Sequence, residues 1–191
     1  MKFRIIITGL GGQGIISLAK IIAKAAFFEG YDVKMSELHG LSQRMGHASC
    51  HVIFGDKVFS SLIKKGDADL IISLEPLEAL RVMQFASKKT SLVLNDYPII
   101  PISVYSDKKE YPSKEFIEKN LEAVFKQVFS INASEKVREE NAGIASTNIF
   151  MLGYAFSKNI IPLKRESLIK AMKETILKNQ EINENIFNLS N

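Results

Sequence analysis

Apolar and polar positions along the first part of the chain predict a strand, a turn and a helix in succession. Residues 3–7 are almost wholly apolar and run into a glycine cluster, which is typical of a strand buried on both faces of a parallel sheet. Residues 15–28 have helical length and only a narrow stripe of polar positions. This pattern predicts a helix that is buried over most of its circumference.

The rest of the chain continues as strands alternating with helices. Alternating positions predict strands at 31–36 and 48–54, and Gly55 begins a tight turn into 58–59, where we expect an antiparallel hairpin. We expect three prolines to make 96–112 a connecting loop, with a short strand near 102–105. The remaining expected elements are strands at 69–74, 91–95 and 128–132, helices at 76–86 and 113–125, a helical stretch at 134–157, and a final helix at 165–187.

This order of elements predicts an α/β fold. We expect a three-layer, Rossmann-like architecture with a mostly parallel sheet, an antiparallel hairpin and C-terminal helices. A chain of 191 residues, of which 46% are hydrophobic, is long enough for one buried core and short for two. We therefore expect residues 1–191 to form a single domain.

The glycine turn is the first candidate site. Gly9, Gly11 and Gly14 satisfy G-x-G-x-x-G between the predicted strand and helix. Backbone N–H groups at such a helix start can face an anion such as a phosphate. The alternative is that the glycines only allow the strand and the helix to pack closely. No Gly-Lys-Ser/Thr sequence follows, which excludes a nucleotide-hydrolysing P-loop.

The second candidate site is the polar segment 37–47, at the carboxyl end of the second predicted strand, where open parallel sheets bind ligands. Glu37 lies about 20 residues beyond the turn, where dinucleotide enzymes keep a ribose-binding acid, although a strand end alone could place an acid there. Arg44 could clamp a phosphate or carboxylate, or anchor a subunit contact. His39, His47 and His51 suggest a metal, but the last two are too far apart on a strand to share one easily.

Composition excludes several classes of function. Cys50 is the only cysteine, so this chain alone cannot build a disulfide framework, a four-cysteine zinc site or an iron–sulfur cluster. Because Cys50 alternates with core residues, we expect a small buried hydrophobe rather than a nucleophile. The net charge is +4, but the 25 basic residues are mixed with 21 acidic ones. This mixing disfavours nucleic-acid binding, which needs a basic patch. With no leader and no membrane-length apolar run, we expect a cytoplasmic protein that binds no membrane.

Three motifs together resemble the γ-type subunits of 2-oxoacid:ferredoxin oxidoreductases, and most closely the small subunits of the indolepyruvate enzymes. They are Gly9-Leu-Gly-Gly-Gln-Gly14, Ser36-Glu-Leu-His-Gly-Leu-Ser-Gln-Arg44 and Asn148-Ile-Phe-Met-Leu-Gly153. The likeness covers nearly the whole chain. One departure is that the family usually continues the second motif with Arg-Gly-Gly, whereas Met45 replaces the first of these glycines here.

The resemblance implies a subunit, without a cofactor of its own, of an enzyme that oxidatively decarboxylates a 2-oxoacid such as indolepyruvate. In that family the larger partner subunit carries thiamine diphosphate and [4Fe–4S] clusters, ferredoxin accepts the electrons, and coenzyme A is the cosubstrate that takes the acyl group. The chain would complete the active-site wall and handle the coenzyme A end. The implied cofactor-binding residues are Gly9, Gly11, Gly12, Gln13, Gly14, Ser42, Gln43 and Arg44, with Glu37 and His39 contacting the ligand or the partner.

Two other functions fit the same residues. One is a stand-alone NAD(P)-dependent oxidoreductase that uses the glycine turn on its cofactor, and the other is a nucleotide- or coenzyme A-sensing binding module. No spacing of Ser, His and Asp, or of paired carboxylates, marks a catalytic group in the sequence. We also expect that the isolated chain could form a homodimer through its small-residue and C-terminal helices.

Overall fold

A computed structural model describes residues 1–39, 46–100, 110–140, 142–143 and 146–190 of the chain. It contains a six-stranded sheet with the order β2-β3-β1-β4-β5-β6. The strands are β1 (Lys2–Leu10), β2 (Asp32–His39), β3 (His47–Gly55), β4 (Leu70–Ser73), β5 (Ser91–Asn95) and β6 (Gln127–Ile131). The helices are α1 (Ile15–Phe28), α2 (Pro76–Val82) with the 3₁₀ turn η1 (Met83–Phe85), α4 (Lys114–Val124), α5 (Ala133–Glu139), α6 (Thr147–Ser157), α7 (Arg165–Thr175) and α8 (Gln180–Leu189).

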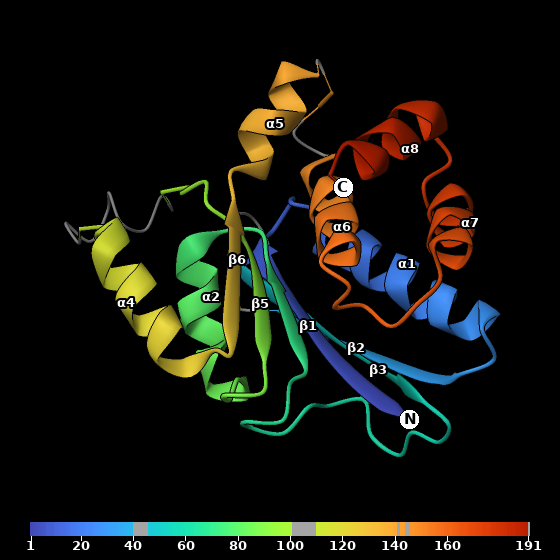
Figure 1. Cartoon of the computed structure of the whole chain (residues 1–191), viewed down its shortest axis with the longest axis horizontal. Coiled ribbons are helices and arrows are strands. Elements are labelled where there is room, and N and C mark those ends of the chain that lie inside the picture. The colour runs from blue at the N-terminus through green and yellow to red at the C-terminus, as the bar shows by residue number, and fades with distance from the viewer. Residues whose placement is uncertain (40–45, 101–109, 141, 144–145, 191) are drawn as a thin grey trace.

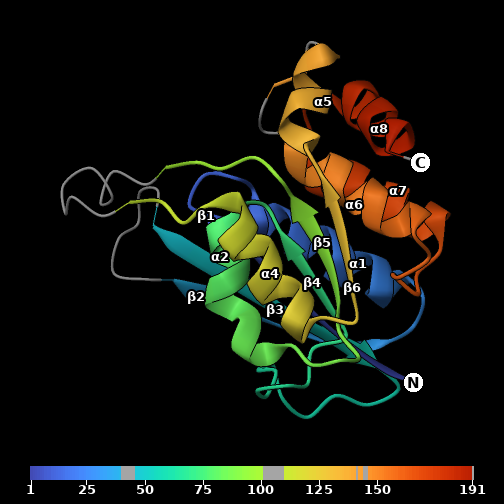
Figure 2. The same cartoon turned by 60° about the vertical axis from the view of Figure 1, so that its left-hand side comes forward.

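Helices cover both faces of the sheet, which gives the three layers that the sequence predicts (Figures 1 and 2). α1, α6, α7 and α8 lie on one face, and α2 and α4 lie on the other. Side chains of β1 contribute to the cores on both faces of the sheet. Ile5 and Ile7 belong to the core under α1, and Ile6 belongs to the core under α2. All three side chains are fully buried, as expected of a strand in the middle of a covered sheet.

The sheet is mixed, as predicted, but its antiparallel hairpin lies elsewhere. β4, β5 and β6 extend the sheet parallel to β1, whereas β3 runs antiparallel to both β1 and β2. The hairpin is therefore β2–β3, and the prediction of one that returns at 58–59 was wrong. Both edges of β3 are already paired along its length, so a strand at 58–59 has no edge to join; Val58 instead donates its N–H to Asp32 Oδ2 at 2.8 Å.

Strand β3 also separates β1 from β2. The chain leaves β1, passes through α1 and enters β2 parallel to β1, but β3 occupies the place between them. The carboxyl ends of β1 and β2 still lie at the same edge of the sheet, because both pair with the start of β3: Leu10 lies opposite His47, and His39 lies opposite Ala48. The glycine turn and the base of segment 37–47 therefore meet at this edge, as the sequence predicts.

The predicted helix at 165–187 is two helices. α7 ends at Thr175, and α8 begins after Asn179, which adopts a left-handed backbone conformation with φ of 54°. Asparagine tolerates this conformation better than most residues, so it can reverse the chain between two amphipathic segments. α7 packs on α1, whereas α8 packs on α6, and a single straight helix could not cover both.

The helical stretch expected at 134–157 is two helices, α5 and α6. The other predicted elements are confirmed to within a few residues, and the short strand expected near 102–105 lies outside the described residues. Among the described helices, none has the length and apolar character needed to cross a bilayer.

Candidate functional site

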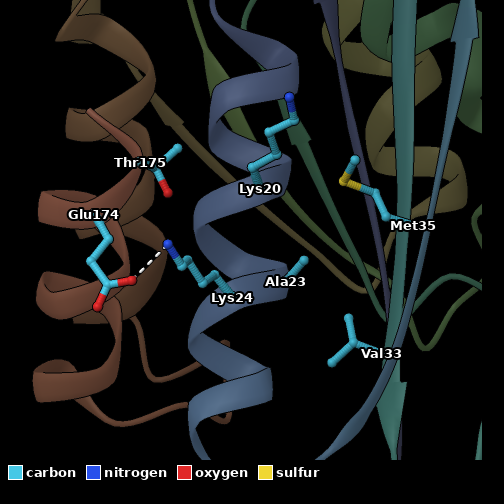
Figure 3. A pocket seen from close by; sticks show the side chains of 7 residues that line it. All are labelled: Lys20, Ala23, Lys24, Val33, Met35, Glu174 and Thr175. Atoms are coloured by element: carbon cyan, nitrogen blue, oxygen red, sulfur yellow. Dashed lines mark ion pairs between the residues drawn. The ribbon is translucent and has the colours of Figure 1, made fainter. Parts of the chain in front are cut away.

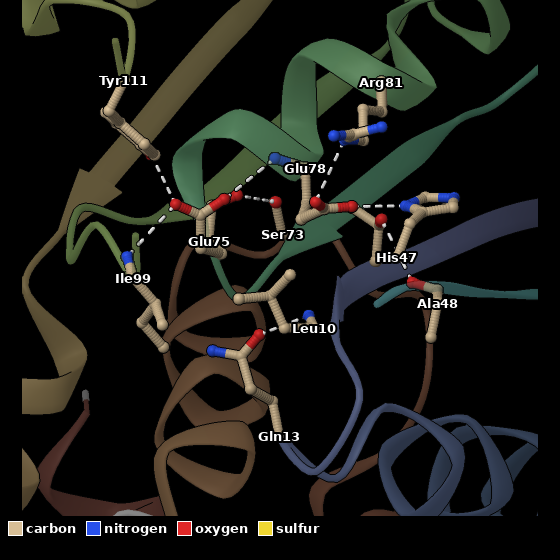
Figure 4. A network of polar contacts seen from close by, with 11 residues as sticks. Leu10, Gln13, His47, Ala48, Ser73, Glu75, Glu78, Arg81, Ile99 and Tyr111 are labelled. Atoms are coloured by element: carbon tan, nitrogen blue, oxygen red, sulfur yellow. Dashed lines mark hydrogen bonds and ion pairs between the residues drawn. The ribbon is translucent and has the colours of Figure 1, made fainter. Parts of the chain in front are cut away.

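The glycine turn joins β1 to α1 and is held by the side chain of Gln13. The Gln13 amide accepts a hydrogen bond from Leu10 N–H at 2.6 Å (Figure 4). It also donates one to Leu74 O at 3.0 Å. A Cβ on Gly9 would lie 2.6 Å from Gln13 Oε1, so the glycine leaves room for this amide. The ligand-binding role of Gln13 stays a prediction, and its observed contacts favour a role in shaping the turn.

Two glycines of the turn adopt left-handed conformations. Gly12 has φ of 98° and Gly14 has φ of 79°, a region that favours glycine because it has no Cβ. Gly14 is also the N-cap of α1. Its carbonyl accepts a hydrogen bond from Asn148 Nδ2 at 3.0 Å, and a Cβ on Gly14 would overlap that amide. The turn therefore needs glycine here both for its conformation and for close contact with α6.

A hollow of about 350 Å³ lies at the start of α1. The α-helix leaves the N–H groups of its first turn without intrahelical partners, and Gly14 offers no side-chain cap. The first turn of α1 also contains no acidic side chain that would occupy the positive end of the helix dipole. The hollow therefore has the charge and hydrogen-bonding character that suits an anion. It is lined by Gly11, Gly12, Gly14, Ile15, Ile16, Ser17 and Ala48.

The base of segment 37–47 contacts the glycine turn directly. Gly11 donates its N–H to Gly46 O at 2.9 Å, so this amide is not available to a ligand. The predicted site residues Ser42, Gln43 and Arg44 lie outside the described residues. His39 is the last residue of β2, and its contact with a ligand or partner stays a prediction.

Glu37 lies in β2 opposite Cys50 of β3, and Cys50 in turn lies opposite Ile7 of β1. A dinucleotide enzyme holds its ribose-binding acid at the end of the strand next to β1. Here β3 takes that place, so Glu37 is two strand spacings, about 9.6 Å, from β1. This placement disfavours the ribose role that we considered for Glu37.

Two buried carboxyl groups lie at the start of α2, beside the glycine turn (Figure 4). Glu75 is 0% exposed and caps α2, with Oε2 accepting the Glu78 N–H at 3.1 Å. Its Oε1 accepts hydrogen bonds from Ile99 N–H at 3.3 Å and from the Tyr111 hydroxyl. Burial raises the pKa of the Glu75 carboxyl, although these hydrogen bonds act in the opposite direction. Burial and the neighbouring Glu75 raise the pKa of the Tyr111 hydroxyl.

Glu78 is 1% exposed and binds the start of β3. Its Oε2 contacts His47 Nδ1, and its Oε1 forms an ion pair with Arg81 Nε at 3.1 Å (Figure 4). A buried carboxylate is costly without partners, and these two groups provide them. His47 therefore interacts with an acid of α2 in this structure, rather than with a second histidine as the metal hypothesis would require.

Cys50 and His51, the other two candidates from the sequence, are buried in the core. Cys50 is 1% exposed, and burial raises the pKa of its thiol to about 12, which disfavours a thiolate nucleophile or ligand at this position. His51 accepts the Ile63 N–H at Nδ1 and packs edge-on against Phe85. Burial lowers the pKa of the His51 imidazole. Among the described residues, no group of three or more His, Cys, Asp or Glu side chains is arranged to hold a metal.

A second hollow, of about 480 Å³, lies farther along α1, where α7 and β2 flank the helix (Figure 3). The edge strand β2 contributes Val33 and Met35 to it, and an ion pair of 2.6 Å between Lys24 and Glu174 joins α1 to α7 across its rim. Both charged side chains are partly exposed. This hollow presents a solvated ion pair and apolar side chains, and it is separate from the edge that carries the glycine turn.

Sequence reasoning missed three residues that organise the site. Glu75 and Glu78 could be identified only as acids in the first turn of a helix, where they usually interact with the dipole at the surface. Asn148 lies in one of the motifs that we quoted, but its contact with Gly14 joins residues distant in the sequence. For all three residues, the sequence shows the residue type but not that the side chain is buried.

Comparisons with known proteins agree with this geometry. A family model described as pyruvate ferredoxin/flavodoxin oxidoreductase matches residues 4–189. The chain is 39% identical over 176 residues to the indolepyruvate oxidoreductase subunit IorB of Archaeoglobus fulgidus, covering 92% of this chain and 87% of that protein.

Solved structures share the fold. The γ subunit of a keto/oxoacid ferredoxin oxidoreductase from Geobacter sulfurreducens superposes with a TM-score of 0.69 at 19% identity, over 98% of this chain and 95% of that one. A 2-oxoglutarate:ferredoxin oxidoreductase from Magnetococcus marinus, solved with 2-oxoglutarate, coenzyme A and succinyl-CoA bound, superposes with a TM-score of 0.72 at 18% identity. That match covers 99% of this chain and 30% of the longer one.

The family match extends over nearly the whole chain, and the solved structures share its fold. The chain belongs to the pyruvate ferredoxin/flavodoxin oxidoreductase family. This confirms the resemblance drawn from the three sequence motifs.

Proposed function

We propose that the chain is the small subunit of an indolepyruvate:ferredoxin oxidoreductase. The complex would decarboxylate an arylpyruvate oxidatively, pass the electrons to ferredoxin and transfer the acyl group to coenzyme A. The name of the Archaeoglobus fulgidus relative supports the substrate, and its match extends over most of both chains.

Within this complex, the chain handles coenzyme A. The observation that supports this role is the hollow at the start of α1, where an uncapped helix N-terminus and a glycine turn can accept a phosphate group. Coenzyme A carries a pyrophosphate and a further phosphate, so it has the anionic groups that this hollow suits. The bound coenzyme A reported for the Magnetococcus marinus enzyme is consistent with the proposal.

The redox cofactors belong to a larger partner subunit. A [4Fe–4S] cluster needs about four thiolate ligands, and this chain has one cysteine, which is buried. The residues of the chain therefore do not fit a cluster. In the proposed division of labour, the partner carries thiamine diphosphate and the clusters, and this chain contributes the glycine-turn edge to the shared site.

The stand-alone NAD(P) enzyme is the weaker candidate, because β3 displaces β2 and Glu37 from the position that a dinucleotide ribose requires. A sensing module would bind coenzyme A without turnover in any reconstituted complex. The same reconstitution therefore tests both alternatives.

Substitution of Ser17 tests the hollow without disturbing the turn. Ser17 lies in the first turn of α1 and lines the hollow. Ser17→Glu places a carboxylate at the helix N-terminus, where the helix dipole tolerates it, but the new charge competes with a phosphate. We expect an increase of about tenfold or more in the KM for coenzyme A in the reconstituted complex.

Ser17→Gln is the matched control, because it has nearly the same size and no charge, and its KM should stay within about twofold of the wild type. Equal KM values for Ser17→Glu and the wild-type complex would refute the placement of coenzyme A at this hollow. The loop residues Ser42, Gln43 and Arg44 stay predictions. If Arg44→Ala left both complex assembly and ferredoxin reduction unchanged, their assignment would be wrong.

A further inference from the structure

A continuous series of contacts leads from the start of α2 to the glycine turn. Glu75 accepts the N–H of Glu78, the Glu78 carboxylate contacts His47, and the residue before His47 accepts the Gly11 N–H. His47 also lies opposite Leu10 in the sheet. The start of β3 is therefore held between an acid of α2 and the backbone of the turn.

The same segment forms part of the candidate site. Gly11 and Ala48 both line the hollow at the start of α1. Ala48 O also accepts a hydrogen bond from Thr8 Oγ1 at 3.3 Å. A shift of the start of β3 would therefore move one wall of the hollow and release the Gly11 amide, while α1 itself stayed in place.

Burial holds the Glu78 carboxylate firmly to its partners. Its side chain is 1% exposed, whereas those of His47 and Arg81 are 30% and 52% exposed. A surface ion pair contributes little, but a buried carboxylate is strongly held to its partners because losing one leaves the charge unsatisfied. Glu75 fixes Glu78 from the other side by capping the helix. The backbone of Glu78 and its carboxylate are thus both restrained.

We propose that Glu78 is a positioning residue, which acts through His47 to hold the start of β3 against the glycine turn and so shapes the wall of the coenzyme A hollow. The part that concerns coenzyme A rests on the proposed function, whereas the positioning of the turn does not. Glu78 touches no reacting group and is not a catalytic residue. Its removal therefore alters binding at the hollow rather than the chemical step.

The first test measures the turn itself, in the isolated chain. Amide exchange followed by NMR reports the Gly11 N–H, which is donated to Gly46 O, and the Leu74 N–H, which is donated to Thr8 O and serves as an internal reference. We expect His47→Ala and Glu78→Ala to accelerate exchange at Gly11 about tenfold or more, with Leu74 unchanged. Glu78→Gln keeps an acceptor for His47 and should restore most of the protection.

The second test uses the reconstituted complex. His47→Ala should raise the KM for coenzyme A about fivefold or more and leave kcat within about twofold, because uniform binding and not the transition state is affected. Arg81→Gln is the control, since it removes the exposed partner of Glu78 and leaves the contact with His47. If Glu78→Ala does not fold, His47→Ala carries both tests, because its side chain is partly exposed.

The outcomes separate the two proposals. Unchanged Gly11 exchange in a folded His47→Ala variant overturns the positioning role. So does an unchanged KM for coenzyme A in His47→Ala when Ser17→Glu raises it. If Gly11 exchange accelerates but neither variant changes the KM, the positioning of the turn is supported and the proposed handling of coenzyme A fails.

Discussion

The contact between Gly14 and Asn148 makes a quantitative prediction about stability. Gly14→Ala introduces a Cβ at a residue with φ of 79°, and that Cβ would overlap the Asn148 amide. A left-handed backbone costs a residue with a Cβ about 1 kcal/mol. Displacing the amide adds its lost hydrogen bond and local overpacking, about 2 kcal/mol together. We expect Gly14→Ala to lower the free energy of unfolding by about 3 kcal/mol.

Gly30→Ala is the matched control for this substitution. Gly30 has φ of 82°, nearly that of Gly14, but no atom lies within 4 Å of the position that its Cβ would take. Gly30→Ala should therefore show only the backbone cost, about 1 kcal/mol. Urea denaturation measures both values, and the corresponding falls in Tm are about 6–12 °C and about 2–4 °C for a chain of this length.

A double-mutant cycle isolates the contact. Asn148→Ala alone loses the hydrogen bond to Gly14 O and should cost about 1 kcal/mol. In the double variant the overlap is gone, so the total should be about 2 kcal/mol rather than the additive value of about 4 kcal/mol. Additive costs, or a Gly14→Ala variant as stable as Gly30→Ala, would refute the claim that the turn is packed against α6.

Three further predictions concern other buried groups. Because Cys50 is 1% exposed and burial raises the pKa of its thiol to about 12, iodoacetamide should modify it only in denaturant, as mass spectrometry would report; rapid labelling of the native chain would contradict this. Burial raises the pKa of Glu75 in the folded state above its ordinary 4.5. The native state therefore binds more protons than the unfolded state, and the free energy of unfolding falls as the pH rises above about 4.5. Glu75→Gln should remove this part of the slope in urea titrations across pH, and an unchanged slope would argue against it. Gly153→Ala would overlap Ser190 across the α6–α8 contact and should cost about 3 kcal/mol, whereas Gly143→Ala, with no atom within 4 Å, should cost less than about 1 kcal/mol.

The layers of the fold follow from patterns that a single stretch of sequence contains. Apolar runs such as residues 3–7 and 91–95 identify buried strands, and the glycines at 9–14 mark the turn between β1 and α1. These features depend on local chemistry, so they can be predicted from the sequence. The antiparallel hairpin was placed wrongly because strand pairing joins distant residues: Asp32 and Lys2 both lie opposite Gly55 in the sheet.

The site could be predicted only in part for a similar reason. The sequence identifies Gly12 and Gly14 as turn residues, and the structure adds that both have positive φ and that Gly14 is packed against Asn148. Glu75 and Glu78 read as ordinary acids in a first helical turn. Their burial depends on His47 and Tyr111, which arrive from other parts of the chain. No periodicity within α2 could report those partners.

The inserted strand β3 connects the fold to the proposed function. In a dinucleotide-binding sheet, the strand beside β1 ends in the acid that binds the ribose. Here the strand beside β1 runs the other way and begins at that edge, so His47 and Ala48 take the place of the ribose-binding acid next to the turn. The phosphate site that we propose at the glycine turn does not depend on that acid, and the strand beside β1 does not supply one. A turn that binds an anion without recognising a dinucleotide would suit the proposed cosubstrate coenzyme A, because its phosphates could be held at the turn while its thiol end extends toward a partner subunit.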